Sequence, residues 1–175
     1  TGWRIIQGAP DFFSVTKKMH NALQGAEINL SDLKKQIYQE VMEQNVARNH
    51  LEHHDMVIVH DPQPLGLIGH YRKHGPWIWR CHVDLSNPNQ DLWEYLKPSI
   101  EQYDAVVVSL PEYKRKLDTP QVVIMPAIDP FTIKNHEMSE EEIDERLKYY
   151  DIPDDLPLVV QISRFDRWKD PQGVI

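Results

Sequence analysis

The sequence predicts an α/β fold built on a Rossmann-like parallel sheet, and three observations support this prediction. Short, nearly continuous apolar runs recur along the chain, as in strands that are buried on both faces. Segments with apolar residues at helical spacing separate these runs, which is the order of parallel strands joined by crossover helices. Polar residues directly follow several of the runs, at the sheet edge where open α/β folds bind ligands.

The first third of the chain is expected to contain two helices between two strands. Residues 3–6 (WRII) are predicted to form a short strand, and residues 11–25 a helix with Asp11 at its start. A longer and more charged helical pattern extends from about residue 31 to residue 51. Residues 56–59 (MVIV) then predict a strand that ends at His60-Asp61-Pro62.

The middle of the chain continues the alternation. A helix is predicted at residues 65–73 and another at 91–103, the second one capped by Asn87 or Asn89. Pro98 should kink or split that second helix, because proline lacks the backbone N–H that a helix interior uses. Three further strands are predicted, at residues 77–81, 105–110 and 122–125.

The pattern changes after residue 125. Residues 125–138 show little periodicity, and we place a hinge there, which divides the chain into residues 1–130 and 131–175. Ser139 and Glu142 form a capping-box pattern that predicts a helix to about residue 150.

The last stretch of the chain reads as a strand, a cationic loop and the start of a helix. Residues 158–162 are apolar, Arg164 and Lys169 follow in a polar loop, and Asp170-Pro171 suits a helix start. This order is typical of an anion site at the carboxyl end of a sheet strand. The alternative is an ordinary solvated loop in which Arg164 and Lys169 are two surface cations.

Composition excludes several classes of protein. A net charge of −8 argues against nucleic acid as a partner, and no apolar run approaches the roughly 20 residues that span a bilayer. The single cysteine, Cys81, excludes an intrachain disulfide and fits a reducing, cytoplasmic compartment. Both ends look cut, so we expect an internal piece of a longer protein, and one with negligible activity by itself.

Candidate site residues cluster where predicted strands end. His60 and Asp61 follow one strand, His82 and Asp84 follow the next, and the Arg164 and Lys169 loop follows the last. Each alone is compatible with an ordinary loop. Their recurrence at the same edge of a parallel sheet favours a site that binds hydroxyl or phosphate groups.

These segments resemble a known family of enzymes. The resemblance rests on VHDPQPLGL (residues 59–67), RCHVDLSNPN (80–89), MPAIDP (125–130) and ISRFDRWKD (162–170). They are similar to retaining nucleotide-sugar glycosyltransferases of the GT-B fold, family 4, and most similar to its trehalose synthase branch. The resemblance implies that residues 1–130 belong to an N-terminal Rossmann-like domain on the acceptor side, and that residues 131–175 begin a second, nucleotide-binding Rossmann-like domain.

The resemblance also implies roles for individual residues. Arg164 and Lys169 match the pair that contacts the donor diphosphate, where two fixed cations stabilise the charge on the leaving group. His82 matches a histidine near the transferred sugar, and Asp61 a position on the acceptor side. His60 is expected to shape the end of its strand rather than to contact substrate.

The implied reaction is glucose transfer from a nucleotide-glucose to glucose, which makes trehalose, with no metal and no cofactor. Alternatives are a trehalose phosphorylase of the same fold and a non-catalytic relative that binds sugar or nucleotide. The histidines at positions 50, 53, 54, 70 and 74 have spacings compatible with zinc, but no convincing third ligand, and we interpret them as structural. Homo-oligomerisation is left open, and a membrane partner is not expected.

Overall fold

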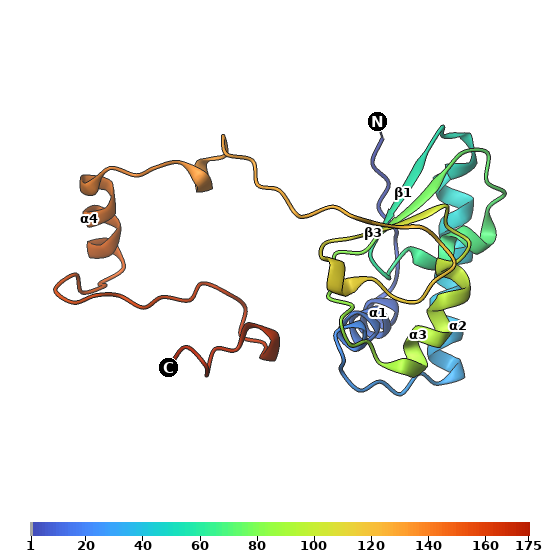
Figure 1. Cartoon of the computed structure of the whole chain (residues 1–175), viewed down its shortest axis with the longest axis horizontal. Coiled ribbons are helices and arrows are strands. Elements are labelled where there is room, and N and C mark those ends of the chain that lie inside the picture. The colour runs from blue at the N-terminus through green and yellow to red at the C-terminus, as the bar shows by residue number, and fades with distance from the viewer. Residues whose placement is uncertain (1) are drawn as a thin grey trace. The chain divides into compact units, whose positions relative to one another are not determined.

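The computed structural model describes residues 2–175, and the chain forms two compact units, Thr1–Ala127 and Ile128–Ile175. Figure 1 colours the chain from blue at its N-terminus to red at its C-terminus. Each unit is described by itself below. The assignment of residues 131–175 to the start of a second Rossmann-like domain stays a prediction.

The first unit contains a four-stranded parallel sheet, which confirms the predicted α/β class. Its strands are β1 (Val57–His60), β2 (Trp77–Arg80), β3 (Ala105–Val108) and β4 (Gln121–Val123), and they lie in the order β1-β2-β3-β4. The register pairs His60 with Arg80 and Arg80 with Val107. The carboxyl ends of the first three strands therefore lie side by side, so that residues following β1 and β2 meet at one edge of the sheet.

Three helices lie beside the sheet of this unit (Figure 1), and their side chains supply much of its core. They are α1 (Pro10–Leu23), α2 (Asp32–Asn49) and α3 (Gln90–Ile100). Helix α3 begins where the sequence placed it, because the Asn89 side chain accepts a hydrogen bond from Leu92 N at 3.2 Å. Buried side chains from the helices and the sheet form one apolar core, whose largest members are Trp77, Trp79, Tyr38, Phe12, Met19 and Leu23.

Two predicted elements of the first unit are wrong. Residues 3–6 form no strand; the segment is instead attached through Gln7, whose backbone N–H and C=O pair with the buried Asn45 amide at 2.8 and 2.7 Å. The helix predicted at residues 65–73 is a short 3₁₀ helix, Leu65–His70. Two glycines, Gly66 and Gly69, lie within this segment, and glycine disfavours a regular α-helix.

The second unit contains one α-helix, α4 (Glu140–Tyr149), with the predicted capping box, and two short 3₁₀ helices. Ser139 Oγ accepts from Glu142 N at 3.3 Å, and the Glu142 carboxylate accepts from Ser139 N at 2.9 Å. Residues 158–162 form no strand, and Asp170 adopts a left-handed conformation with φ 45° after a short 3₁₀ turn, so no helix starts there. Val159 and Ile162 are largely exposed, and the described part of this unit offers no strand for them to pair with.

Across the described residues, no helix combines the length and the apolar character that crossing a bilayer requires.

Candidate functional site

The candidate site begins at Asp61, the residue that follows β1. Asp61 has a left-handed backbone, with φ 66°, a conformation that aspartate tolerates better than most residues. Its N–H donates to Arg80 O at 2.9 Å, and its C=O accepts from the Trp79 indole N–H at 3.0 Å. Both backbone polar groups of Asp61 are therefore held by β2, and this fixes the direction of the side chain.

The Asp61 carboxylate connects the two strand ends. Its Oδ1 atom accepts a hydrogen bond from His82 N at 2.8 Å. The structure thus brings together two of the predicted site residues, and the aspartate orients the backbone that carries His82. A hydrogen bond to a carboxylate is stronger than one between neutral groups, so this contact stiffens the edge of the sheet.

His60 has a larger role in the geometry than the sequence suggested. Its Nδ1 atom lies 2.9 Å from Nε2 of His82, and the two ring planes are within 11° of each other. The Trp3 ring lies at a centroid distance of 6.3 Å from His60. The sequence placed both histidines at one edge of the sheet but did not predict their contact, which depends on the register that pairs His60 with Arg80.

The charges around His60 act in both directions on its protonation. Partial desolvation lowers the pKa of His60, and the neighbouring His82 and the Arg80 guanidinium lower it further, whereas the Asp61 carboxylate opposes them. The net effect is a lowered pKa, which favours the uncharged imidazole at neutral pH.

Arg80 is a residue of this edge that the sequence analysis did not single out. It lies at the end of β2 and is only 9% exposed. Its Nη2 atom donates to Ser109 Oγ at 3.2 Å, while Nη1 is buried and has no hydrogen-bond partner among the residues that the structure describes. Arg80 therefore places a buried positive charge at this edge of the sheet, with one N–H group that has no hydrogen-bond partner among the described residues.

A cavity of about 890 Å³ lies beside β1, and its lining includes Trp3, Ile5, Ile58, His60 and Gln63. Within the described residues β1 lies at the edge of the sheet, and the cavity runs along it as far as His60 at its carboxyl end. Its size falls in the range of small-molecule sites.

Arg164 and Lys169 belong to the second unit. The Arg164 side chain is 82% exposed, and its Nη2 atom lies 3.5 Å from Asp166 Oδ2. Lys169 ends the 3₁₀ turn Arg167–Lys169, and its carbonyl accepts from the Gln161 amide. Their predicted contact with a donor diphosphate stays a prediction.

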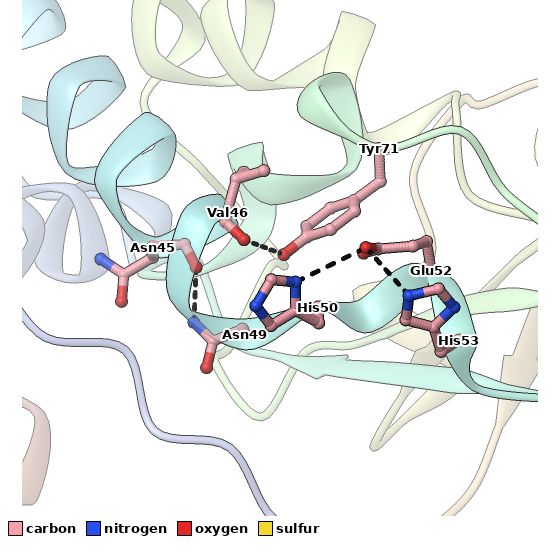
Figure 2. A network of polar contacts seen from close by, with 7 residues as sticks. All are labelled: Asn45, Val46, Asn49, His50, Glu52, His53 and Tyr71. Atoms are coloured by element: carbon pink, nitrogen blue, oxygen red, sulfur yellow. Dashed lines mark hydrogen bonds and ion pairs between the residues drawn. The ribbon is translucent and has the colours of Figure 1, made fainter.

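The histidines that follow α2 lie beside a carboxylate. Figure 2 shows Glu52 between His50 and His53, with its Oε1 atom 3.7 Å from His50 Nδ1 and 3.5 Å from His53 Nε2. Nearby, the Tyr71 hydroxyl donates to Val46 O at 3.1 Å, in a separate contact (Figure 2). Over residues 2–175, no three histidine, cysteine or acidic side chains are grouped so that they could hold a metal ion.

These features define the class of the first unit. Parallel strands with intervening helices make it a Rossmann-like α/β domain, and polar side chains gather at the strands' carboxyl ends.

Comparison with known proteins identifies the family. Residues 1–115 match the model of the trehalose synthase N-terminal domain. Trehalose synthases from Thermococcus litoralis, Pyrococcus horikoshii and Rubrobacter xylanophilus are 44%, 46% and 41% identical to this chain over 99% of its length. The chain belongs to the trehalose synthase family, and it spans about 43% of the length of the relative from Thermococcus litoralis.

A more distant similarity extends to another trehalose enzyme. A trehalose phosphorylase from Pleurotus sajor-caju is 27% identical over 60% of the chain, and the matched region is 17% of that protein.

Proposed function

We propose that the intact protein is a retaining glucosyltransferase, which transfers glucose from a nucleotide-glucose donor to glucose and forms trehalose. The observation that carries this proposal is the coupling of Asp61 to His82 at a strand-end edge, in a chain that belongs to the trehalose synthase family. A fixed carboxylate beside an imidazole suits the binding of sugar hydroxyls, which need both hydrogen-bond donors and acceptors.

The two units contribute different chemistry in this proposal. Asp61 and His82 bind and orient sugar, whereas Arg164 and Lys169 stabilise the nucleoside diphosphate as it leaves. The bond between the anomeric carbon and the phosphate oxygen breaks, a bond to the acceptor hydroxyl oxygen forms on the same face, and the hydroxyl proton passes to the leaving phosphate. The balance of the reaction requires neither a metal nor a further cofactor.

The second candidate is a trehalose phosphorylase, which the similarity to the Pleurotus sajor-caju protein favours. In that reaction phosphate, rather than a nucleotide, is the partner of the glucosyl group. A non-catalytic relative that binds sugar or nucleotide is a third outcome of the test below.

Product analysis of the intact protein separates these candidates. One reaction contains nucleotide-glucose and glucose, and the other contains trehalose and inorganic phosphate. Trehalose formation in the first supports the transferase, glucose 1-phosphate in the second supports the phosphorylase, and turnover in neither would contradict both.

The donor site has its own test. Replacing Arg164 or Lys169 by alanine in the intact protein should weaken nucleoside diphosphate binding by about 1.5–3 kcal/mol for each lost charged hydrogen bond. Arg146→Ala is the matched control, because Arg146 is also an exposed arginine of the second unit. Unchanged affinity in the Arg164 and Lys169 variants, measured by calorimetry, would remove both residues from the site.

A further inference from the structure

The hydrogen bond between the two imidazoles restricts what they can offer to a ligand. A bond between His60 Nδ1 and His82 Nε2 needs one N–H and one lone pair. If His60 donates, its Nε2 atom is an acceptor and His82 Nδ1 carries a hydrogen. If His82 donates, the two outer nitrogens exchange these roles. A neutral pair therefore always presents one donor and one acceptor.

Both outer nitrogens are available for binding. His60 and His82 are exposed, and within the described residues the only hydrogen bond of either ring is the one that joins them. The backbone on each side is fixed, because Asp61 bonds to Arg80 O and to His82 N. His60 also reaches the cavity beside β1.

We infer that His60 and His82 act as one unit that binds the hydroxyl groups of the acceptor sugar, with His60 positioning the His82 ring and fixing its tautomer. The resemblance places His82 near the transferred sugar; the hydrogen bond from His82 N to the acceptor-side Asp61 is the reason for assigning the pair to the acceptor instead. The inference rests on the proposed function and deepens it. A hydroxyl group both donates and accepts, so a donor and an acceptor side by side match a polyhydroxyl ligand better than they match an anion.

The pair loses this property when it takes up a proton. Both outer nitrogens then carry hydrogens, and the acceptor is gone. The groups that face His60 are His82 and Arg80 of β2 and its extension, Asp61 of its own strand end, and the Trp3 ring. The lowered pKa of His60 keeps the neutral pair populated to more acidic pH than an ordinary histidine, whose pKa is about 6.5.

The test compares two substitutions of His60 in the intact protein. His60→Leu removes the bond to His82, whereas the amide of His60→Asn can replace Nδ1 in that bond and does not titrate. We expect His60→Leu to raise KM for glucose about tenfold, as for one lost hydrogen bond, and to leave KM for the nucleotide-glucose unchanged. His60→Asn should restore most of the glucose affinity and flatten the acid limb of its pH profile.

Histidine-selective ¹⁵N spectroscopy of the intact protein gives a readout that does not depend on turnover. Glucose should shift the imidazole nitrogens of both His60 and His82, and glucose 6-phosphate should shift them less. His53, an exposed histidine of the same unit, is the internal reference, and His53→Asn is the matched variant. Arg80→Met removes a charge that lowers the pKa of His60, so the acid loss of glucose binding should move to higher pH.

The outcomes keep this inference separate from the proposed function. Trehalose synthesis with an unchanged glucose KM and pH profile in His60→Leu would overturn the inference and leave the function intact. Glucose-dependent shifts of both rings without any transfer would support the inference and contradict the function. An equal loss of glucose affinity in His60→Asn and His60→Leu would show that His60 does not position the His82 ring.

Discussion

Asp61 is the residue at which stability and the candidate site are most closely coupled, and Asp61→Ala should destabilise the first unit. The substitution removes the carboxylate that accepts from His82 N at 2.8 Å, a charged hydrogen bond worth about 1.5–3 kcal/mol. It also leaves alanine at φ 66°, which costs roughly 1–2 kcal/mol in the left-handed region. Because Asp61 is only half-buried, solvent weakens the charged hydrogen bond. We therefore expect the free energy of unfolding to fall by about 3 kcal/mol, near the lower end of the sum of the two contributions.

Two further substitutions separate the contributions. Asp61→Asn keeps an amide oxygen as acceptor and a side chain that tolerates the left-handed region. This variant should therefore lose the least free energy of unfolding. Asp61→Gly loses the hydrogen bond but not the backbone conformation, and should fall between the other two. The measurement is urea unfolding, followed by the fluorescence of the buried Trp77 and Trp79.

The order of the three variants tests the reasoning more strictly than any single value. If Asp61→Gly proves less stable than Asp61→Ala, the left-handed backbone contributes no strain. If all three lie within about 0.5 kcal/mol of the unsubstituted chain, the bond to His82 N does not stabilise the fold. As a control, the slope of the free energy of unfolding against urea concentration should be the same in all variants, which shows that they undergo the same transition.

Three other predictions concern the buried groups around the site. Asn45→Ala should cost about 2–3 kcal/mol and speed proteolysis before residue 10, because Asn45 holds both backbone groups of Gln7. Tyr38→Phe should cost about 1–3 kcal/mol in urea unfolding at unchanged core volume, because the Tyr38 hydroxyl accepts from Gly66 N and donates to a buried carbonyl. Burial raises the pKa of Cys81 to about 12, so an alkylating reagent at pH 8 should modify it only after unfolding in urea; rapid reaction of the folded chain would contradict that burial.

The sequence predicted the elements whose signals are local. Helices α1 and α2 follow from apolar spacing, although neither has a side-chain cap, whereas α3 and α4 also have the expected caps at Asn89 and Ser139. The capping box at Ser139 forms because both of its partners lie within four residues. The strands predicted at residues 3–6 and 158–162 are absent from the described structure, because an apolar run becomes a strand only where another strand pairs with it. That information is not local, and the pattern of one segment does not contain it.

The same distinction separates the predicted and the missed residues of the site. Asp61 and His82 were found from their place after apolar runs, and the structure joins them. The His60 pair and the orphaned Arg80 nitrogen depend on which residues of β1, β2 and β3 lie opposite one another. A shift of one residue in that register would place the His60 side chain on the other face of the sheet, where it could not contact His82.

Linkage between protonation and folding gives the histidine pair a consequence for stability. The pKa of His60 is lower in the folded chain than in the unfolded chain, so between these two pKa values the unfolded chain binds more protons. Stability is therefore lost as the pH falls from the ordinary histidine range through the pKa of the folded chain. Glucose that binds the neutral pair should therefore raise the unfolding temperature of the intact protein more at pH 7.5 than at pH 5. In His60→Asn, whose side chain does not titrate, the stabilisation by glucose should vary less between these two pH values. Equal stabilisation of the unsubstituted protein at both would show that glucose does not distinguish the neutral pair from the protonated one.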